Sequence, residues 1–131
     1  MTTMLEDFIA AFEYLKVHPE CSGKVGVVGF CFGGWISNMM AVKVPGLGAS
    51  VPFYGGQPTE DIDKINAPLL LHFGELDTRV NEGWPAYEEA LQRQTTVFTM
   101  TPPRGMIGKP LNWPGDGPSI FLGKNSLKIE L

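Results

Sequence analysis

The stretch Lys24-Val-Gly-Val-Val-Gly-Phe-Cys-Phe-Gly-Gly34 decides the fold that we expect for this chain. Residues 24–30 are rich in β-branched side chains and do not alternate between polar and apolar. This pattern is typical of a strand buried on both faces in a parallel sheet. Residues 33–43 have the composition of a helix that opens with two glycines and ends before Pro45-Gly46. The stretch therefore predicts a buried strand, a tight turn at Cys31 and a helix.

Strand and helix patterns alternate on both sides of this stretch. Residues 3–17 predict an amphipathic helix, because apolar side chains recur at helical spacing from Leu5 to Phe12. Downstream, the sequence predicts two further strands, at residues 49–54 and 68–73, and two further helices, at residues 60–65 and 81–93. This order favours an α/β fold with a mainly parallel sheet flanked by helices and right-handed crossovers.

The composition changes after about residue 100. Residues 101–131 contain 5 glycines and 5 prolines among 31 residues, whereas residues 1–100 contain 11 glycines and 6 prolines. Within the tail, only residues 126–131 hint at a helical or strand period. We therefore expect a partial domain over residues 1–94 and an atypical, irregular Gly/Pro-rich tail over residues 95–131.

Composition and charge exclude several classes of function. The chain has 131 residues, 44% of them apolar, and a net charge of −4 without a basic cluster. We expect no nucleic-acid or membrane partner. No apolar run approaches the roughly 18 residues of a membrane span, and the first residues do not resemble a secretory signal, so we expect a cytoplasmic protein. Two cysteines and two histidines make neither a disulfide framework nor a metal site, and we expect no cofactor.

The sharpest chemical signal is Gly29-Phe30-Cys31-Phe32-Gly33, a G-x-nucleophile-x-G pattern between a strand and a helix. Such a turn holds a nucleophile in a strained backbone conformation, and bulky neighbours would collide there. It places the Phe32 N–H and the helix N-terminus where an oxyanion would form. The pattern is neither a P-loop nor a dinucleotide fingerprint. The open alternative is that Cys31 is an inert buried thiol, and the motif favours the nucleophile.

Asp77 is the second signal. It follows the third predicted strand by four residues and comes later in the sequence than Cys31, as the acid of a catalytic triad does in this type of fold. The alternative is that Asp77 is an ordinary turn or helix-capping residue before the helix at 81–93. Spacing alone does not decide between the two.

Three blocks together resemble the dienelactone hydrolase (carboxymethylenebutenolidase) family of α/β-hydrolases: Lys24–Gly34, Val51–Gly56 and Ala67–Asn81. The resemblance covers about residues 3–93. It implies a partial α/β-hydrolase fold and a Cys-His-Asp triad that opens a lactone or ester, with Cys31 as nucleophile and Asp77 orienting the histidine. It requires no metal or organic cofactor.

Tyr54 and Arg79 are candidate substrate-binding residues. Arg79 lies near the acid loop, where a basic side chain suits the carboxylated lactone that the resemblance implies, although it can equally be a solvated surface residue. Tyr54, Trp35 and Trp84 can line a pocket, but aromatic residues beside glycine turns are more often core residues.

The chain also departs from the family pattern. The longer N-terminal region of the family, which supplies early strands and a second oxyanion N–H, is missing. The resemblance places the family histidine after the helix at 81–93 and one further strand, but no histidine follows His72. His18 and His72 are expected to be structural. We therefore expect little or no turnover from this chain.

Two alternatives to catalysis stay open. The chain can be a non-catalytic fragment that self-associates or binds a partner through an exposed sheet edge. It can also carry a redox-reactive thiol at Cys31.

We further hypothesise that residues 95–131 are a frame-shifted translation of the family C-terminus. A shifted codon consists of the third base of one residue's codon and the first two bases of the next. Read in this way, Met106-Ile107 must encode Asp and Trp113-Pro114 must encode Ala, and Thr95-Thr96 can encode His. The shifted string resembles the histidine loop and final helix of the family. The gene sequence tests this hypothesis.

Overall fold

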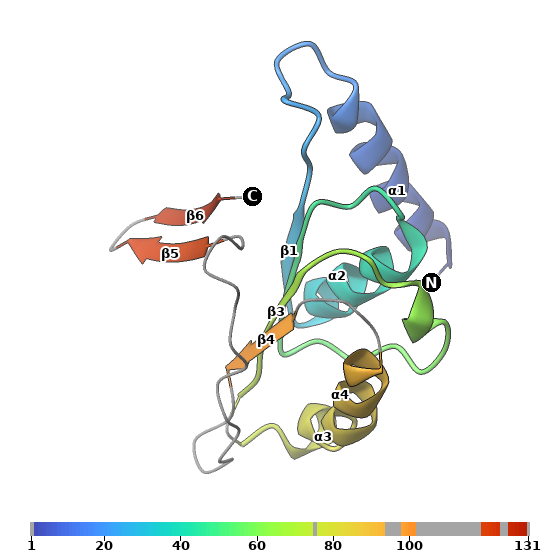
Figure 1. The fold of residues 1–131 in the computed structure, drawn as a ribbon, viewed down its shortest axis with the longest axis vertical. Coiled ribbons are helices and arrows are strands. Elements are labelled where there is room, and N and C mark those ends of the chain that lie inside the picture. The colour runs from blue at the N-terminus through green and yellow to red at the C-terminus, as the bar shows by residue number, and fades with distance from the viewer. Residues whose placement is uncertain (1, 75, 94–97, 102–118, 124–125, 131) are drawn as a thin grey trace.

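The computed structural model of the chain describes residues 2–74, 76–93, 98–101, 119–123 and 126–130 (Figure 1). Its centre is a parallel sheet of four strands, whose order in the sheet is the order along the chain. The strands are β1 (Val27–Phe30), β2 (Ser50–Phe53), β3 (Leu69–His72) and β4 (Phe98–Thr101). The expected α/β fold with a parallel sheet is confirmed.

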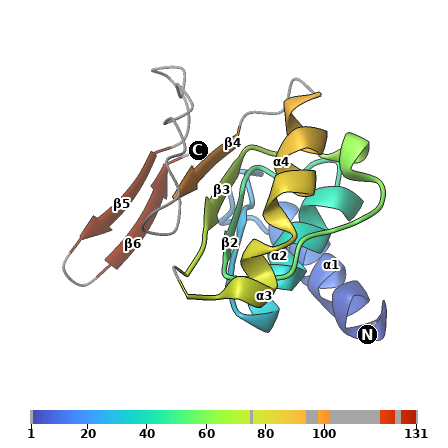
Figure 2. The same ribbon diagram turned by 90° about the horizontal axis from the view of Figure 1, so that it is seen from below.

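The helices gather on one face of this sheet, as Figure 2 shows. They are α1 (Thr2–Lys16), α2 (Phe32–Lys43), α3 (Thr78–Asn81) and α4 (Trp84–Gln92), together with a 3-10 turn η1 (Ile62–Lys64). The helix expected over about 81–93 is present as α4, which begins three residues later than expected, and the short helix α3 before it was not expected. Pro85 lies in the first turn of α4, where its missing N–H is tolerated, so a new helix starts there. The acidic helix expected over 60–65 is only the 3-10 turn.

Helix α2 forms the core with the sheet and packs directly on β1 and β2. A Cβ built on Gly34 of α2 would lie 2.5 Å from the backbone oxygen of Phe53, so the helix approaches β2 closely. The Ser50 hydroxyl donates to the backbone oxygen of Ser37 at 2.8 Å and ties the strand to the helix. The largest fully buried apolar side chains are Tyr87, Ile36, Ile65, Leu69, Leu71, Leu91 and Val51.

The opposite face of the sheet carries a row of three stacked rings. Phe30 pairs in register with Phe53, and Phe53 pairs with His72. The ring centroids lie 4.6 Å apart for Phe30 and Phe53 and 4.2 Å apart for Phe53 and His72. Phe30 remains 55% exposed and Val28 38% exposed. The expectation that residues 24–30 are buried on both faces is therefore wrong for β1, because the described helices cover only the other face.

The part of the chain beyond residue 94 contains strands that its composition did not predict. Strand β4 pairs in parallel with β3, so the sheet continues past that residue. Strands β5 (Ser119–Gly123) and β6 (Ser126–Glu130) form a separate antiparallel pair. Strand β6 coincides with the period seen at residues 126–131. Residues 94–97 and 102–118, on which the shifted-frame hypothesis mainly depends, lie outside the described residues.

Candidate active site

Cys31 occupies the turn between β1 and α2 in an unusual backbone conformation. Its φ is 56° and its ψ is −116°, angles that side-chain-bearing residues rarely adopt. The Cys31 N–H donates to the Phe53 oxygen at 3.1 Å. The Cys31 oxygen accepts from the N–H groups of Gly34 at 3.0 Å and Trp35 at 3.2 Å. These bonds hold the strained turn, and the side chain of Cys31 is exposed. The expected tight turn at Cys31 is thus present.

Glycines make this turn possible, but not at both of the expected positions. A Cβ built on Gly29 would overlap the backbone oxygen of Gly33, so position 29 requires glycine. A Cβ on Gly33 would meet no heavy atom within 4 Å, so the expected crowding at Gly33 is wrong. The second crowded pair is Gly34 and Gly55, whose backbones touch where α2 crosses the end of β2.

A pocket of about 350 Å³ opens beside the Cys31 side chain. Five of the residues singled out from the sequence line it. They come from the turn after β1, from α2, from the residue after β2 and from α3. The residues lining this pocket are Cys31, Phe32, Trp35, Tyr54, Gly56 and Arg79. Because the carboxyl ends of parallel strands meet at one edge of a sheet, these distant segments converge there.

Among the aromatic candidates, Tyr54 and Trp35 line the pocket, whereas Trp84 is a core residue at 4% exposure. Tyr54 also has a positive φ of 39°, and its N–H donates to the His72 oxygen at 2.7 Å. The end of β2 is thus strained at the residue that contributes a phenol to the pocket.

Asp77 is the N-cap of α3. Its Oδ1 accepts from the Val80 N–H at 3.2 Å, and it does not belong to the lining of the Cys31 pocket. Asn81 supports the same loop, because its Nδ2 donates to the Gly74 oxygen at 2.8 Å. The capping role considered for Asp77 is therefore present in the geometry.

The two histidines lie apart from the pocket lining. His18 follows α1, where its Nδ1 accepts from the Glu20 N–H at 3.2 Å. His72 stacks on Phe53 within the sheet. Burial lowers the pKa of His72, which favours the neutral imidazole. Both histidines have the structural surroundings that their sequence positions indicated.

The described residues hold neither a candidate metal cluster nor a helix suited to span a membrane. No three His, Cys, Asp or Glu side chains in that part of the chain gather closely enough to hold a metal ion. None of the helices within the described ranges is both long enough and apolar enough to cross a bilayer.

The fold is that of the α/β-hydrolases. The structure superposes on Pyrococcus horikoshii acylaminoacyl peptidase with a TM-score of 0.65, over 74% of this chain and 22% of that chain, at 15% sequence identity. The profile of the Dienelactone hydrolase family matches residues 1–100, and the chain belongs to this family. The resemblance found in the three sequence blocks is confirmed.

Two curated relatives illustrate the similarity. Protein usf of Aquifex pyrophilus is 42% identical over 96 residues, which cover 62% of this chain and 40% of that protein. The carboxymethylenebutenolidase of Pseudomonas putida is 32% identical over 74 residues, which cover 54% of this chain and 31% of that enzyme. The chain spans about a third of the length of the curated relatives it matches.

Proposed function

We propose that this chain carries the nucleophile and part of the substrate pocket of a dienelactone hydrolase-type enzyme. The Cys31 thiolate attacks the carbonyl carbon of a lactone or ester, and the Phe32 N–H holds the oxyanion at the N-terminus of α2. The observation that carries the proposal is the strained, exposed Cys31 at a helix N-terminus beside a pocket.

The pocket also supports a substrate class. The Arg79 guanidinium and the Tyr54 phenol line the same space as the thiol. A guanidinium recognises carboxylates with paired hydrogen bonds, so a carboxylated lactone or ester fits this lining. Arg79 is exposed, which leaves it accessible to such a group.

We further propose that the chain acylates but turns over slowly. Attack by the thiolate breaks the ester C–O bond, releases the alcohol and leaves a thioester on Cys31. Hydrolysis of that thioester needs a general base to activate water. No histidine of the described chain lines the pocket, and the Asp77 carboxylate is engaged in capping α3. Asp77 would serve as triad acid only beside a histidine that this part of the chain does not bring to the pocket.

Reaction with p-nitrophenyl acetate tests both statements. We expect a burst of about one p-nitrophenolate per chain, followed by little turnover, with the acetyl group on Cys31 by mass spectrometry. Cys31→Ala should abolish the burst, and Cys21→Ala is the matched control that keeps it. Absence of the burst, or equal acetylation of Cys21, would overturn the assignment of Cys31 as the nucleophile. Sustained Cys31-dependent turnover would overturn slow deacylation.

A second candidate function is self-association through the outer strand of the sheet. Strand β1 lies at one end of the strand order, and its side chains Val28 and Phe30 are exposed. An unpaired strand edge with apolar side chains favours pairing with another copy. Size-exclusion chromatography with light scattering tests this candidate, and a monomer at 100 μM would exclude it.

A further inference from the structure

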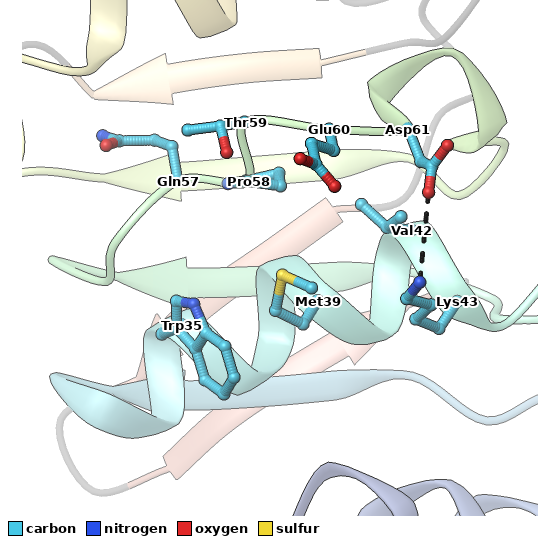
Figure 3. Close-up of a pocket in the computed structure, with 9 residues that line it drawn as sticks. All are labelled: Trp35, Met39, Val42, Lys43, Gln57, Pro58, Thr59, Glu60 and Asp61. Carbon is cyan, nitrogen blue, oxygen red and sulfur yellow. Dashed lines mark ion pairs between the residues drawn. The ribbon is translucent and has the colours of Figure 1, made fainter. Parts of the chain in front are cut away.

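A second pocket, of about 240 Å³, lies along α2 next to the Cys31 pocket (Figure 3). Its helical side consists of Trp35, Met39, Val42 and Lys43, which share one face of α2 at helical spacing. Its other side is the loop of residues 57–61. Lys43 Nζ and Asp61 Oδ2 approach to 4.0 Å at the end farthest from Trp35 (Figure 3). The pocket thus has apolar side chains of the helix facing a polar loop.

The two pockets adjoin at Trp35, because it lines both of them. Its ring stacks on the Phe32 ring with centroids 5.5 Å apart. On its other side, a Cβ built on Gly56 would lie 3.3 Å from Trp35 Cδ1. Gly56 lines the first pocket and the next residue, Gln57, lines the second. The indole is therefore held between a ring and the backbone at the boundary.

We propose that Trp35 determines the length of the acyl group that reaches Cys31. The pocket along α2 is a subsite for a straight apolar acyl chain, and the indole closes it, so short acyl groups are favoured. The inference rests on the proposed function, since it takes Cys31 as the group that is acylated. Met39 and Val42 supply the apolar surface that a longer chain would contact once the indole is removed.

The size of the effect follows from burial of methylene groups. Each CH₂ transferred from water into an apolar pocket improves binding about fourfold. An acyl chain that buries two more methylene groups in the pocket should therefore bind at least about tenfold more tightly. Removing the indole should therefore improve the reaction only of reagents with a long alkyl group, because a short group does not reach past the position of the indole.

Alkylation by N-ethylmaleimide and N-octylmaleimide tests the proposal without using ester hydrolysis. The thiolate sulfur adds to the maleimide double bond and solvent supplies the proton to the neighbouring carbon. Rates at Cys31 and Cys21 are measured in the full chain by peptide mass spectrometry. The octyl-to-ethyl rate ratio at Cys31, divided by that at Cys21, removes the intrinsic reactivity of each reagent.

Trp35→Ala should raise this normalised ratio at least tenfold, and Trp35→Leu should raise it at least threefold. Circular dichroism checks folding, and Trp35→Leu carries the test if the alanine variant does not fold. A substitution inside the α2 pocket then shows where the octyl group lies. Met39→Glu, added to Trp35→Ala, should remove the gain, because it puts a charge inside the α2 pocket. Val17→Glu is the matched control, since Val17 is 76% exposed on another segment, and the gain should persist.

An unchanged ratio in both Trp35 variants would overturn the proposal. A gain that survives Met39→Glu would also overturn it, because the octyl chain would then lie elsewhere. The p-nitrophenyl acetate burst is scored separately. If the burst is missing but the octyl-to-ethyl ratio rises tenfold, Cys31 is not the nucleophile of a hydrolase and the subsite stands. If the burst is normal but the ratio does not rise, only the subsite is refuted.

Discussion

The backbone N–H of Cys31 donates to the carbonyl oxygen of Phe53 at 3.1 Å, which links the candidate nucleophile to the neighbouring strand. Phe53 is also the central ring of the stack formed with Phe30 and His72. The register of β1, β2 and β3 therefore sets the position of the Phe53 carbonyl, which holds the Cys31 turn. The strained conformation is imposed by pairing between distant segments and not by the local sequence alone.

Gly29→Ala should destabilise the chain by at least about 3 kcal/mol, because the new Cβ would overlap the Gly33 oxygen. Gly33→Ala is the matched control. Its Cβ would meet open space near the start of α2, so a change within about 1 kcal/mol is expected, in the stabilising direction. Urea unfolding measures both. Equal losses for the two variants would contradict the assigned close contact.

Cys31→Gly should stabilise the chain by about 1 kcal/mol. Glycine adopts a φ of 56° without the strain that a side chain meets, and the gain exceeds its larger entropy loss on folding. Cys31→Ala keeps the Cβ and should leave the free energy of unfolding nearly unchanged. Urea unfolding of the three proteins checks the difference. A glycine variant less stable than the alanine variant would refute strain at this turn.

The phenol of Tyr87 should make stability fall at alkaline pH. Burial raises the pKa of Tyr87 above its ordinary value of 10.0. The unfolded chain releases this proton near pH 10 while the native chain keeps it, so stability is lost as the pH rises further. The loss reaches about 1.4 kcal/mol per pH unit.

Tyr87→Phe is the test of this assignment. It should reduce the alkaline loss measured by urea unfolding between pH 9 and pH 11. At neutral pH the variant should be about 1–2 kcal/mol less stable, because Asn38 Oδ1 loses the 3.2 Å bond from the phenol. An alkaline loss of the same size in both proteins would assign it to other groups.

His72 should make stability fall at acid pH. Burial lowers the pKa of His72 below its ordinary value of 6.5. The unfolded chain then binds a proton that the native chain excludes, so stability decreases as the pH drops below about 6.5 toward the native pKa. His72→Phe keeps the stacked ring and should remove this loss in urea unfolding at pH 7.5 and pH 5. His18→Gln is the control that should retain it, and the reverse outcome would exclude His72.

Much of the fold could be predicted because its signals are local. The apolar stripe of α1 and the β-branched run before Cys31 each occupy a few consecutive residues. The same run did not reveal that Val28 and Phe30 are exposed, because an apolar pattern does not say which elements are present to cover it. Strand β4 has two threonines among its four residues and lacks the continuous apolar run that marks β3.

The site was predictable where a motif defines it. The turn at Cys31 follows from the motif, in which Gly29 is required by the close contact with Gly33, and Tyr54 and Arg79 lie within matched blocks that converge at one sheet edge. Trp35 lines the pocket, although an aromatic residue beside a glycine turn favours a core role; its position four residues after Cys31 places it one helical turn away. The missed pair Gly34 and Gly55 depends on contact between α2 and β2, which spacing along the chain does not encode.

The sequential order of the sheet has a consequence for synthesis on the ribosome. Since β1, β2, β3 and β4 pair in the order in which they are translated, each new strand finds its partner already made and outside the exit tunnel. No strand has to wait for a later segment to be inserted between itself and its neighbour. The sheet of residues 27–101 can therefore grow by one strand at a time, always at the edge opposite β1.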